Sequence, residues 1–353
     1  MSPEYSKDKP AGFSNRVEKV AVIGAGGRMG SHIVENLLKT GKHAVTIISR
    51  PNSASTFPDG VQVAWIDYNV EDNTTLVEAL KGQQALIIAL SVMAPRDTIF
   101  KLIHASAKAG VSYVLPNWYG HDPADDKMCE DVLFTPFRNK MIAEFKSLGV
   151  SSYILLSCGF WYEFSLGGGA DRYGFDFKKR SLTFFDGGNT TISTSTWQQC
   201  GKAIANLLSL KEFPENEDDR SVTLSQFRNV PVYISSFELS QRDMFESVKR
   251  VTGTTDADWT ITDESSEERW QSAKNALEQK GDAHAFVQML YSRTFFPNGG
   301  GNIKLTRGLH NDVLGLEKDD LDESTAVAIS MGENNEPVVH KSKDVYGDLF
   351  KAE

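Results

Sequence analysis

Short apolar runs and longer amphipathic stretches alternate along the first 160 residues of the chain. The runs are rich in Val, Ile, Leu and Ala, as expected for strands buried on both faces. The expected strands are 17–23, 44–49, 61–66, 85–90, 112–116 and 153–157, and the expected helices are 28–40, 73–80, 97–109 and 135–148. This alternation predicts an α/β fold with a Rossmann-type, doubly wound parallel sheet.

The ends and faces of these helices support the same prediction. Ile33 and Leu37, with Val34 and Leu38 beside them, share one face of the first helix. A glycine follows each of the four helices, at positions 41, 82, 110 and 149. A left-handed residue commonly closes a helix, and glycine adopts that conformation readily.

The pattern changes after Phe160, where the regular alternation stops. We expect helices at 198–209, 242–251 and 267–290, a strand at 221–225, and a polar acidic stretch from Glu317. We therefore predict a flexible N-terminal arm over 1–16, a Rossmann domain over 17–160, and a smaller C-terminal α+β substrate lobe over 161–353. Some segments of that lobe are expected to return to the sheet.

Composition narrows the class of protein. The longest apolar run, 85–90, is too short to span a bilayer, and residues 1–16 contain no apolar signal segment. The three cysteines have neither metal-ligand nor disulfide spacing, which favours a cytoplasmic protein. A formal charge of −10 argues against nucleic-acid binding, but it leaves room for a local phosphate site.

Gly24, Gly27 and Gly30 lie three residues apart between the first strand and the first helix. Such spacing allows a tight turn, close approach of the backbone to a pyrophosphate, and close helix–strand packing. The expected cofactor contacts here are Gly24, Gly26, Gly27, Arg28, Met29 and Gly30. A glycine-rich structural turn is the alternative, but the order of strand, loop and helix favours a dinucleotide.

Arg50 indicates which dinucleotide is bound. It closes the second strand, where NAD-specific folds carry an acidic residue, and no acid lies near it in the sequence. A guanidinium there binds a 2′-phosphate, which predicts NADPH/NADP, with Arg28 as a second cation. Both arginines could instead be ordinary surface residues. Asp67 is a candidate for the adenine edge or for a helix cap, and Ser91 and Asn117 follow the fourth and fifth strands as further cofactor candidates.

Together these features resemble the NmrA-like and isoflavone-reductase-like family of atypical short-chain dehydrogenases, most closely its fungal oxidoreductase members. The resemblance rests on 24–30, Arg50, 61–67, 115–120, 137–140 and 152–161, and continues loosely to about residue 315. It implies a monomeric or homodimeric Rossmann protein with a C-terminal substrate lobe. Plant relatives reduce phenylpropanoids and flavonoids with NADPH, whereas another branch binds the dinucleotide without chemistry and regulates transcription factors.

The resemblance also implies a catalytic lysine. Ordinary short-chain dehydrogenases use a tyrosine four residues before a lysine, and here only Tyr5 and Lys9, in the N-terminal arm, have that spacing. Pro136 stands four residues before Lys140. The isoflavone-reductase branch lacks the tyrosine as well, so Lys140 is expected beside the nicotinamide ribose, relaying a proton. A solvated lysine on a helix surface is the alternative.

Candidate substrate residues follow the fifth and sixth strands, because ligands bind at the carboxyl ends of strands in open α/β sheets. They are Trp118, Tyr119, His121, Phe160 and Trp161. The aromatic rings fit a planar, apolar substrate, and His121 is the histidine best placed for proton relay. Core packing explains the aromatic residues equally well, and a surface loop explains His121.

These observations favour an NADPH-dependent reductase of a small hydrophobic substrate that is aromatic, phenylpropanoid-like or polyketide-like. Hydride would reach a C=C, C=O or C=N carbon. The alternative is a non-catalytic, NADP(H)-sensing regulator that binds a protein partner. An epimerase or isomerase that reuses its bound cofactor is a third reading.

Overall fold

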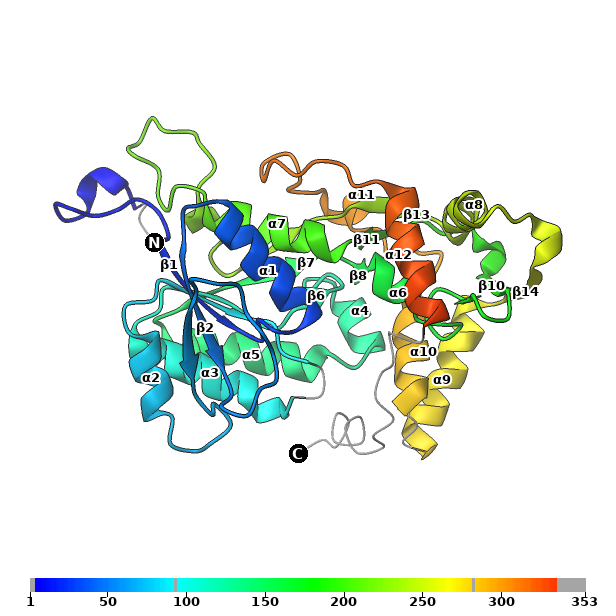
Figure 1. The fold of residues 1–353 in the computed structure, drawn as a ribbon, viewed down its shortest axis with the longest axis horizontal. Helices are drawn as coiled ribbons and strands as arrows, with labels where there is room; N and C mark the ends of the chain where they lie inside the picture. The colour runs from blue at the N-terminus through cyan, green and yellow to red at the C-terminus, as the bar shows by residue number, and fades with distance from the viewer. Residues whose placement is uncertain (1–3, 92–93, 281–282, 335–353) are drawn as a thin grey trace.

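A parallel sheet forms the centre of the computed structural model, which describes residues 4–91, 94–280 and 283–334 (Figure 1). The strands lie in the order β12-β7-β5-β4-β1-β2-β3, with β6 paired to β7, and every printed pairing among them is parallel. Their bounds are β1 Lys19–Ile23, β2 Ala44–Ser49, β3 Gln62–Trp65, β4 Ala85–Ile88, β5 Tyr113–Leu115, β6 Tyr119–Gly120, β7 Ser152–Ser157 and β12 Val230–Tyr233. The order reverses between β1 and β4, which makes that point the switch point of the sheet.

Helices cover both faces of this sheet (Figure 1). On one face lie α1 (Arg28–Lys39) and α7 (Trp197–Leu208), and on the other lie α2 (Thr74–Leu80), α3 (Arg96–Ala109) and α5 (Thr135–Leu148). Each strand and helix expected before residue 160 is present, with ends that differ by no more than two residues. The predicted Rossmann-type sheet is confirmed.

The second half of the chain contributes to the first domain through α7. A Cβ at Gly201 would lie 2.6 Å from the His32 carbonyl oxygen of α1, so only glycine allows the two helices to approach this closely. The Asn36 side-chain amide donates to the same carbonyl oxygen at 2.8 Å. The N-terminus of α7 is thereby held beside the N-terminus of α1.

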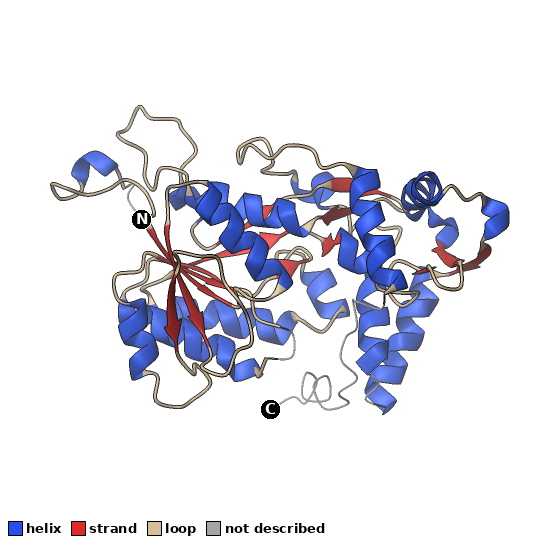
Figure 2. Ribbon diagram, viewed as in Figure 1, coloured by secondary structure: helices blue, strands red, loops and turns tan. Residues whose placement is uncertain are grey.

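The remaining elements form a second body with two small sheets, β14-β10-β9 and β13-β11-β8 (Figure 2). Its strands are β8 Phe160–Trp161, β9 Phe175–Asp176, β10 Ser181–Phe185, β11 Ile192–Ser195, β13 Phe237–Leu239 and β14 Thr260–Glu264. Its helices are α6 Tyr162–Leu166, α8 Gln241–Thr252, α9 Ser266–Lys280, α10 Ala283–Thr294, α11 Ile303–Arg307 and α12 Leu321–Glu333, and α4 Asp126–Asp131 precedes α5. A separate, largely aromatic core fills this body. The chain thus has the predicted smaller α+β lobe.

Two expectations for the second half were wrong. The strand expected at 221–225 is absent, and β12 follows it instead, because Pro231 conceals an edge strand in the sequence pattern. The helix expected at 267–290 is two helices, α9 and α10, that pack against each other. The polar stretch after Glu317 contains α12, whose N-terminus is capped by the Asp320 carboxylate.

Residues 4–16, expected to be a flexible arm, make defined contacts. The Ser6 amide donates to the Pro214 carbonyl at 2.8 Å, and the Asn15 side chain exchanges hydrogen bonds with the backbone of Phe213. These bonds attach the segment to the loop that follows α7. In the described part of the chain, no helix is both long and apolar enough to cross a bilayer.

A buried ion pair joins the two bodies. The Arg293 guanidinium of α10 donates to the Asp131 carboxylate of α4 at 2.7 Å, and the two side chains are only 1% and 8% exposed. Removing one partner of a buried pair leaves an uncompensated charge in a poor solvent. This pair therefore fastens α10 to the Rossmann domain.

We expect Asp131→Ala to lower the free energy of unfolding by about 3–5 kcal/mol, because the Arg293 charge stays buried without its partner. The measurement is urea unfolding followed by circular dichroism. Glu130→Ala is the matched control, since its 72%-exposed carboxylate only reaches the exposed Lys127 and is worth at most about 1 kcal/mol. Equal destabilisation by the two changes would contradict this role of the buried pair.

Candidate functional site

The glycine loop connects β1 to α1 at the switch point of the sheet. Gly24 has φ +84°, and a Cβ there would lie 2.1 Å from the Ala89 carbonyl oxygen at the end of β4. A Cβ at Gly30 would lie 2.0 Å from the Gly24 carbonyl oxygen. Neither contact admits a side chain, so the first and last glycines are required for the loop to fold as it does.

The N-terminus of α1 is open to a ligand. Gly27 is its N-cap and provides no capping side chain, and no acidic residue lies in its first turn. Thr196, Ser240 and Asp320 cap α7, α8 and α12 with side-chain oxygens. The first amide groups of α1 can therefore bind a phosphate, assisted by the helix dipole. Met29 is 5% exposed, so its side chain belongs to the core and only its backbone can contribute.

A segment that sequence reasoning missed lies over this loop. A Cβ at Gly26 would lie 2.1 Å from the Ser55 side-chain oxygen, so Ser55 is in contact with the loop backbone. Ser55 belongs to the stretch between β2 and β3, which carries no sequence signal beyond being polar. This makes Ser55 an additional candidate for contact with the cofactor.

Arg50 is exposed directly after β2, at the same edge of the sheet. Burial raises the pKa of Tyr68, and the nearby Arg50 charge acts against that rise. Arg50 is therefore close to Tyr68, beyond the ends of β2 and β3. The Asp67 carboxylate accepts a hydrogen bond from the Asn69 amide at 3.0 Å, which is a turn contact, and its role at the adenine stays a prediction.

Arg28 and Arg50 contact different residues. Its guanidinium is 5.4 Å from the centre of the Trp197 ring, and one of its nitrogens is 3.7 Å from the Met331 sulfur of α12. These contacts place Arg28 beside α7 and α12, and its role as a second cation on the 2′-phosphate stays a prediction.

Ser91 and Asn117 follow β4 and β5, which are neighbours in the sheet. Ser91 is exposed and Asn117 is half-buried. Both lie at the carboxyl edge that also carries the glycine loop, as predicted for cofactor contacts. Direct contact of either side chain with the dinucleotide stays a prediction.

Lys140 is exposed in the second turn of α5. Its Nζ lies 4.8 Å from the centre of the Phe100 ring of α3, and Phe137 packs on the same ring. No carboxylate among the described residues forms an ion pair with Lys140. Its position beside the nicotinamide ribose and its role in proton transfer stay predictions.

Trp118 and His121 lie in the core instead of the crevice. Trp118 is 4% exposed, and its indole N–H donates to the His121 carbonyl oxygen at 3.0 Å. Burial lowers the pKa of His121 to about 4, so its imidazole is neutral near pH 7. Phe134 packs edge-on against both rings. Neither residue is free to stack on a substrate or to relay a proton to one.

Tyr119, Phe160 and Trp161 are half-buried. The Tyr119 hydroxyl donates to the Ile88 carbonyl at 2.9 Å, so it is already engaged, and burial raises its pKa. Phe160 stacks on Tyr291 at 4.3 Å. Trp161, by contrast, has a buried indole N–H without a hydrogen-bond partner among the described residues.

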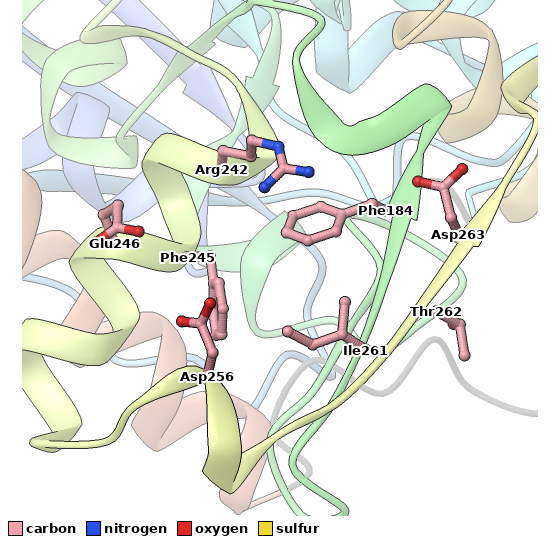
Figure 3. A pocket seen from close by; sticks show the side chains of 8 residues that line it. All are labelled: Phe184, Arg242, Phe245, Glu246, Asp256, Ile261, Thr262 and Asp263. Atoms are coloured by element: carbon pink, nitrogen blue, oxygen red, sulfur yellow. The ribbon is translucent and has the colours of Figure 1, made fainter.

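A hollow in the second body lies elsewhere (Figure 3). Arg242 of α8 stacks on Phe184 of β10 at its rim, and β14 forms the opposite wall. The residues that line it all come from the second body. No residue of the glycine loop lines this hollow, so it is separate from the predicted site. No group of acidic, His or Cys side chains in the described residues could hold a metal ion.

Comparison with known proteins agrees with this geometry. Residues 24–145 match the model of a family described as NAD(P)H-binding. "Oxidoreductase aprR" of Aspergillus flavus is 26% identical over 311 residues, which is 87% of this chain and 97% of that protein.

Solved structures agree on the fold. A crystal structure of isoflavone reductase superposes with a TM-score of 0.65 at 18% identity, covering 88% of this chain and 98% of that one. An Escherichia coli NADPH-dependent quinone oxidoreductase complexed with NADPH gives 0.61 at 18% identity, covering 87% and 98%. At such identities the likeness establishes the architecture.

We expect Gly30→Ala to weaken dinucleotide binding roughly 100-fold, equivalent to losing one strong charge-assisted phosphate contact. The new methyl group would displace the Gly24 carbonyl and deform the loop. Fluorescence titration with NADPH measures the effect. Gly41→Ala is the control: Gly41 lies beyond the other end of α1 with φ +64°, and nothing lies within 4 Å of its Cβ position, so its replacement strains the backbone without touching the loop. Unchanged affinity in Gly30→Ala would contradict the assignment of the loop.

Proposed function

We propose, from the premise that this chain is an NAD(P)H-binding oxidoreductase with the isoflavone reductase fold, that it reduces a small hydrophobic molecule with NADPH. The observation that carries the proposal is the uncapped N-terminus of α1 beneath a loop in which Gly24 and Gly30 leave no room for side chains. Loops of this kind bind the pyrophosphate of a dinucleotide.

NADPH is the proposed form of the cofactor because of Arg50. Arg50 is exposed directly after β2, and an arginine at that position in a Rossmann-type fold can accommodate a 2′-phosphate, which supports this proposal. Asp67, the acidic residue that follows β3, is engaged in a turn. The structurally similar E. coli quinone oxidoreductase is described as NADPH-dependent, which supports the same choice.

Arg50→Glu should raise the dissociation constant of NADPH about 10- to 100-fold, because a charge-assisted phosphate contact contributes about 1.5–3 kcal/mol. NADH lacks the 2′-phosphate and provides the matched control on the same two proteins. Its affinity should change little. Equal weakening of both cofactors, or equal affinity of the unaltered protein for both, would rule out the phosphate role of Arg50.

The proposed substrate class is a planar, apolar carbonyl, enone or imine compound. NADPH, when bound, supplies the hydride for its reduction. Lys140 is the proposed group at the nicotinamide ribose, where its charge would orient the cofactor and assist proton movement. We further propose that the protein acts as a cytoplasmic monomer or homodimer, without a nucleic-acid or membrane partner.

Lys140→Ala should lower kcat about 100-fold, within the range of a lost proton-transfer group. Steady-state NADPH oxidation with an aromatic ketone or enone is the measurement. Lys146→Ala changes an exposed lysine on the same helix and should leave kcat unaltered. Full turnover in Lys140→Ala would exclude this lysine from catalysis.

A sensing role is the second candidate, because the described chain has no tyrosine four residues before Lys140, where Pro136 stands. In that case the protein would bind NADPH and a protein partner without oxidising the cofactor. NADPH binding with no oxidation across ketones, enones and imines would favour this candidate.

A further inference from the structure

Three aromatic rings from different elements meet next to the glycine loop. Trp161 of β8, Phe164 of α6 and Trp197 of α7 form a triangle with ring centres 6.1, 6.2 and 6.1 Å apart. Arg28, the first residue of α1, lies over the Trp197 ring. The triangle therefore adjoins the N-terminus of α1, beyond the carboxyl end of β7.

Buried polar atoms without partners gather in this cluster. The indole N–H groups of Trp161 and Trp197 and one carboxyl oxygen of Glu163 have no hydrogen-bond partner among the described residues. Trp197 is 6% exposed and Glu163 is 8% exposed. Buried polar groups in folded proteins are nearly always paired, so several unpaired groups in one cluster indicate a ligand that pairs with them.

Glu163 is held within the cluster by α7. Its carboxyl group accepts hydrogen bonds from its own backbone amide and from the Trp197 backbone amide, while Oε2 has no partner among the described residues. Burial raises the pKa of Glu163 to about 7, and the charge of Asp319 adds to the rise. A large fraction of Glu163 therefore carries a proton at neutral pH.

The other charged groups around α6 are engaged elsewhere. Asp319 accepts hydrogen bonds from Thr196 and Ser236, and Asp322 of α12 pairs with Arg250. The Arg172 guanidinium carbon lies 3.7 Å from the centre of the Phe164 ring, one of the three rings of the cluster. No cation among the described residues forms an ion pair with Glu163. Its unpaired oxygen is thus free to donate a proton to a ligand.

We propose that Glu163, with the indole N–H groups of Trp161 and Trp197, forms the polar end of the substrate site and binds the carbonyl oxygen of a planar aromatic ketone or enone. The inference rests on the proposed reductase function. Two indole donors and a protonated carboxyl are all hydrogen-bond donors, so the cluster suits an acceptor oxygen and disfavours an ammonium group. The three rings provide an apolar wall for the rest of the molecule.

For a ketone the reaction balances as follows. Hydride from NADPH bonds to the carbonyl carbon, the C=O π electrons move to oxygen, and NADPH becomes NADP⁺. The Glu163 carboxyl proton bonds to that oxygen, which gives the alcohol and leaves a carboxylate that water reprotonates. Lys140 of α5 lies against Phe100 of α3, on the opposite face of the sheet from α7. Glu163 and Lys140 would therefore act on different groups, Glu163 on the substrate oxygen and Lys140 at the nicotinamide ribose.

The test compares Glu163→Gln and Trp197→Phe with the unaltered protein. Turnover is followed by NADPH oxidation, and binding by calorimetry on NADP⁺-saturated protein, with acetophenone and benzylideneacetone as probes. Glu163→Gln should lower kcat about 100-fold while NADPH affinity stays within about twofold. Trp197→Phe should raise the dissociation constant of the probes about tenfold.

The pH profile provides a second readout. Turnover of the unaltered protein should be high below pH 7 and fall above it, because only protonated Glu163 donates. Glu163→Gln should lose this fall. Glu212→Gln is the matched control: Glu212 is equally buried, but it is paired with Tyr113 and Arg228, and it should keep both kcat and the profile.

The outcomes separate the two proposals. Full turnover and an unchanged pH profile in Glu163→Gln would overturn the inference and leave the reductase function intact. Probe binding that Trp197→Phe weakens, without any NADPH oxidation by the unaltered protein, would support the cluster as a binding site and overturn the reductase function. No binding of either probe by the unaltered protein would overturn the site.

Discussion

The contact of the Gly24 backbone with the Ala89 carbonyl, at the point where the sheet order reverses, governs how the rest of this molecule is arranged. It brings the ends of β1 and β4 together, and the equally close contact of Gly30 with Gly24 turns the chain at once into α1. An uncapped helix N-terminus then points toward the carboxyl edge of the sheet.

The second half of the chain uses α1 as its anchor. Gly201 lets α7 lie directly against α1, and the N-terminus of α7 in turn presents Trp197 beside Arg28. A second attachment is the Asp131–Arg293 ion pair, which ties α10 to the Rossmann domain. Two separate contacts therefore attach the second half of the chain to the Rossmann domain.

The sequence was sufficient to predict features that depend only on the order of residues along the chain. The spacing of Gly24 and Gly30, and Arg50 after the second strand, are properties of neighbouring residues and were readable directly. The sequence did not show whether a side chain faces the crevice or the core. Trp118 and His121 follow the fifth strand as expected, yet both are buried in the core. Ser55 and Glu163 were missed because contacts distant in sequence determine their surroundings. β12 was missed because it contains Pro231. A proline is tolerated in an edge strand, and the position of β12 at the edge of the sheet depends on its distant partner β7.

The central claim, that a cofactor bound by the glycine loop gives up hydride to a small molecule, is tested most directly by isotope transfer. The protein is incubated with NADPH deuterated at C4 and with aromatic ketones and enones, and the products are analysed by mass spectrometry. The account predicts a reduced product that carries deuterium on carbon, formed in step with NADP⁺. Tight NADPH binding with no deuterium in any product would contradict it and would indicate a protein that senses the dinucleotide.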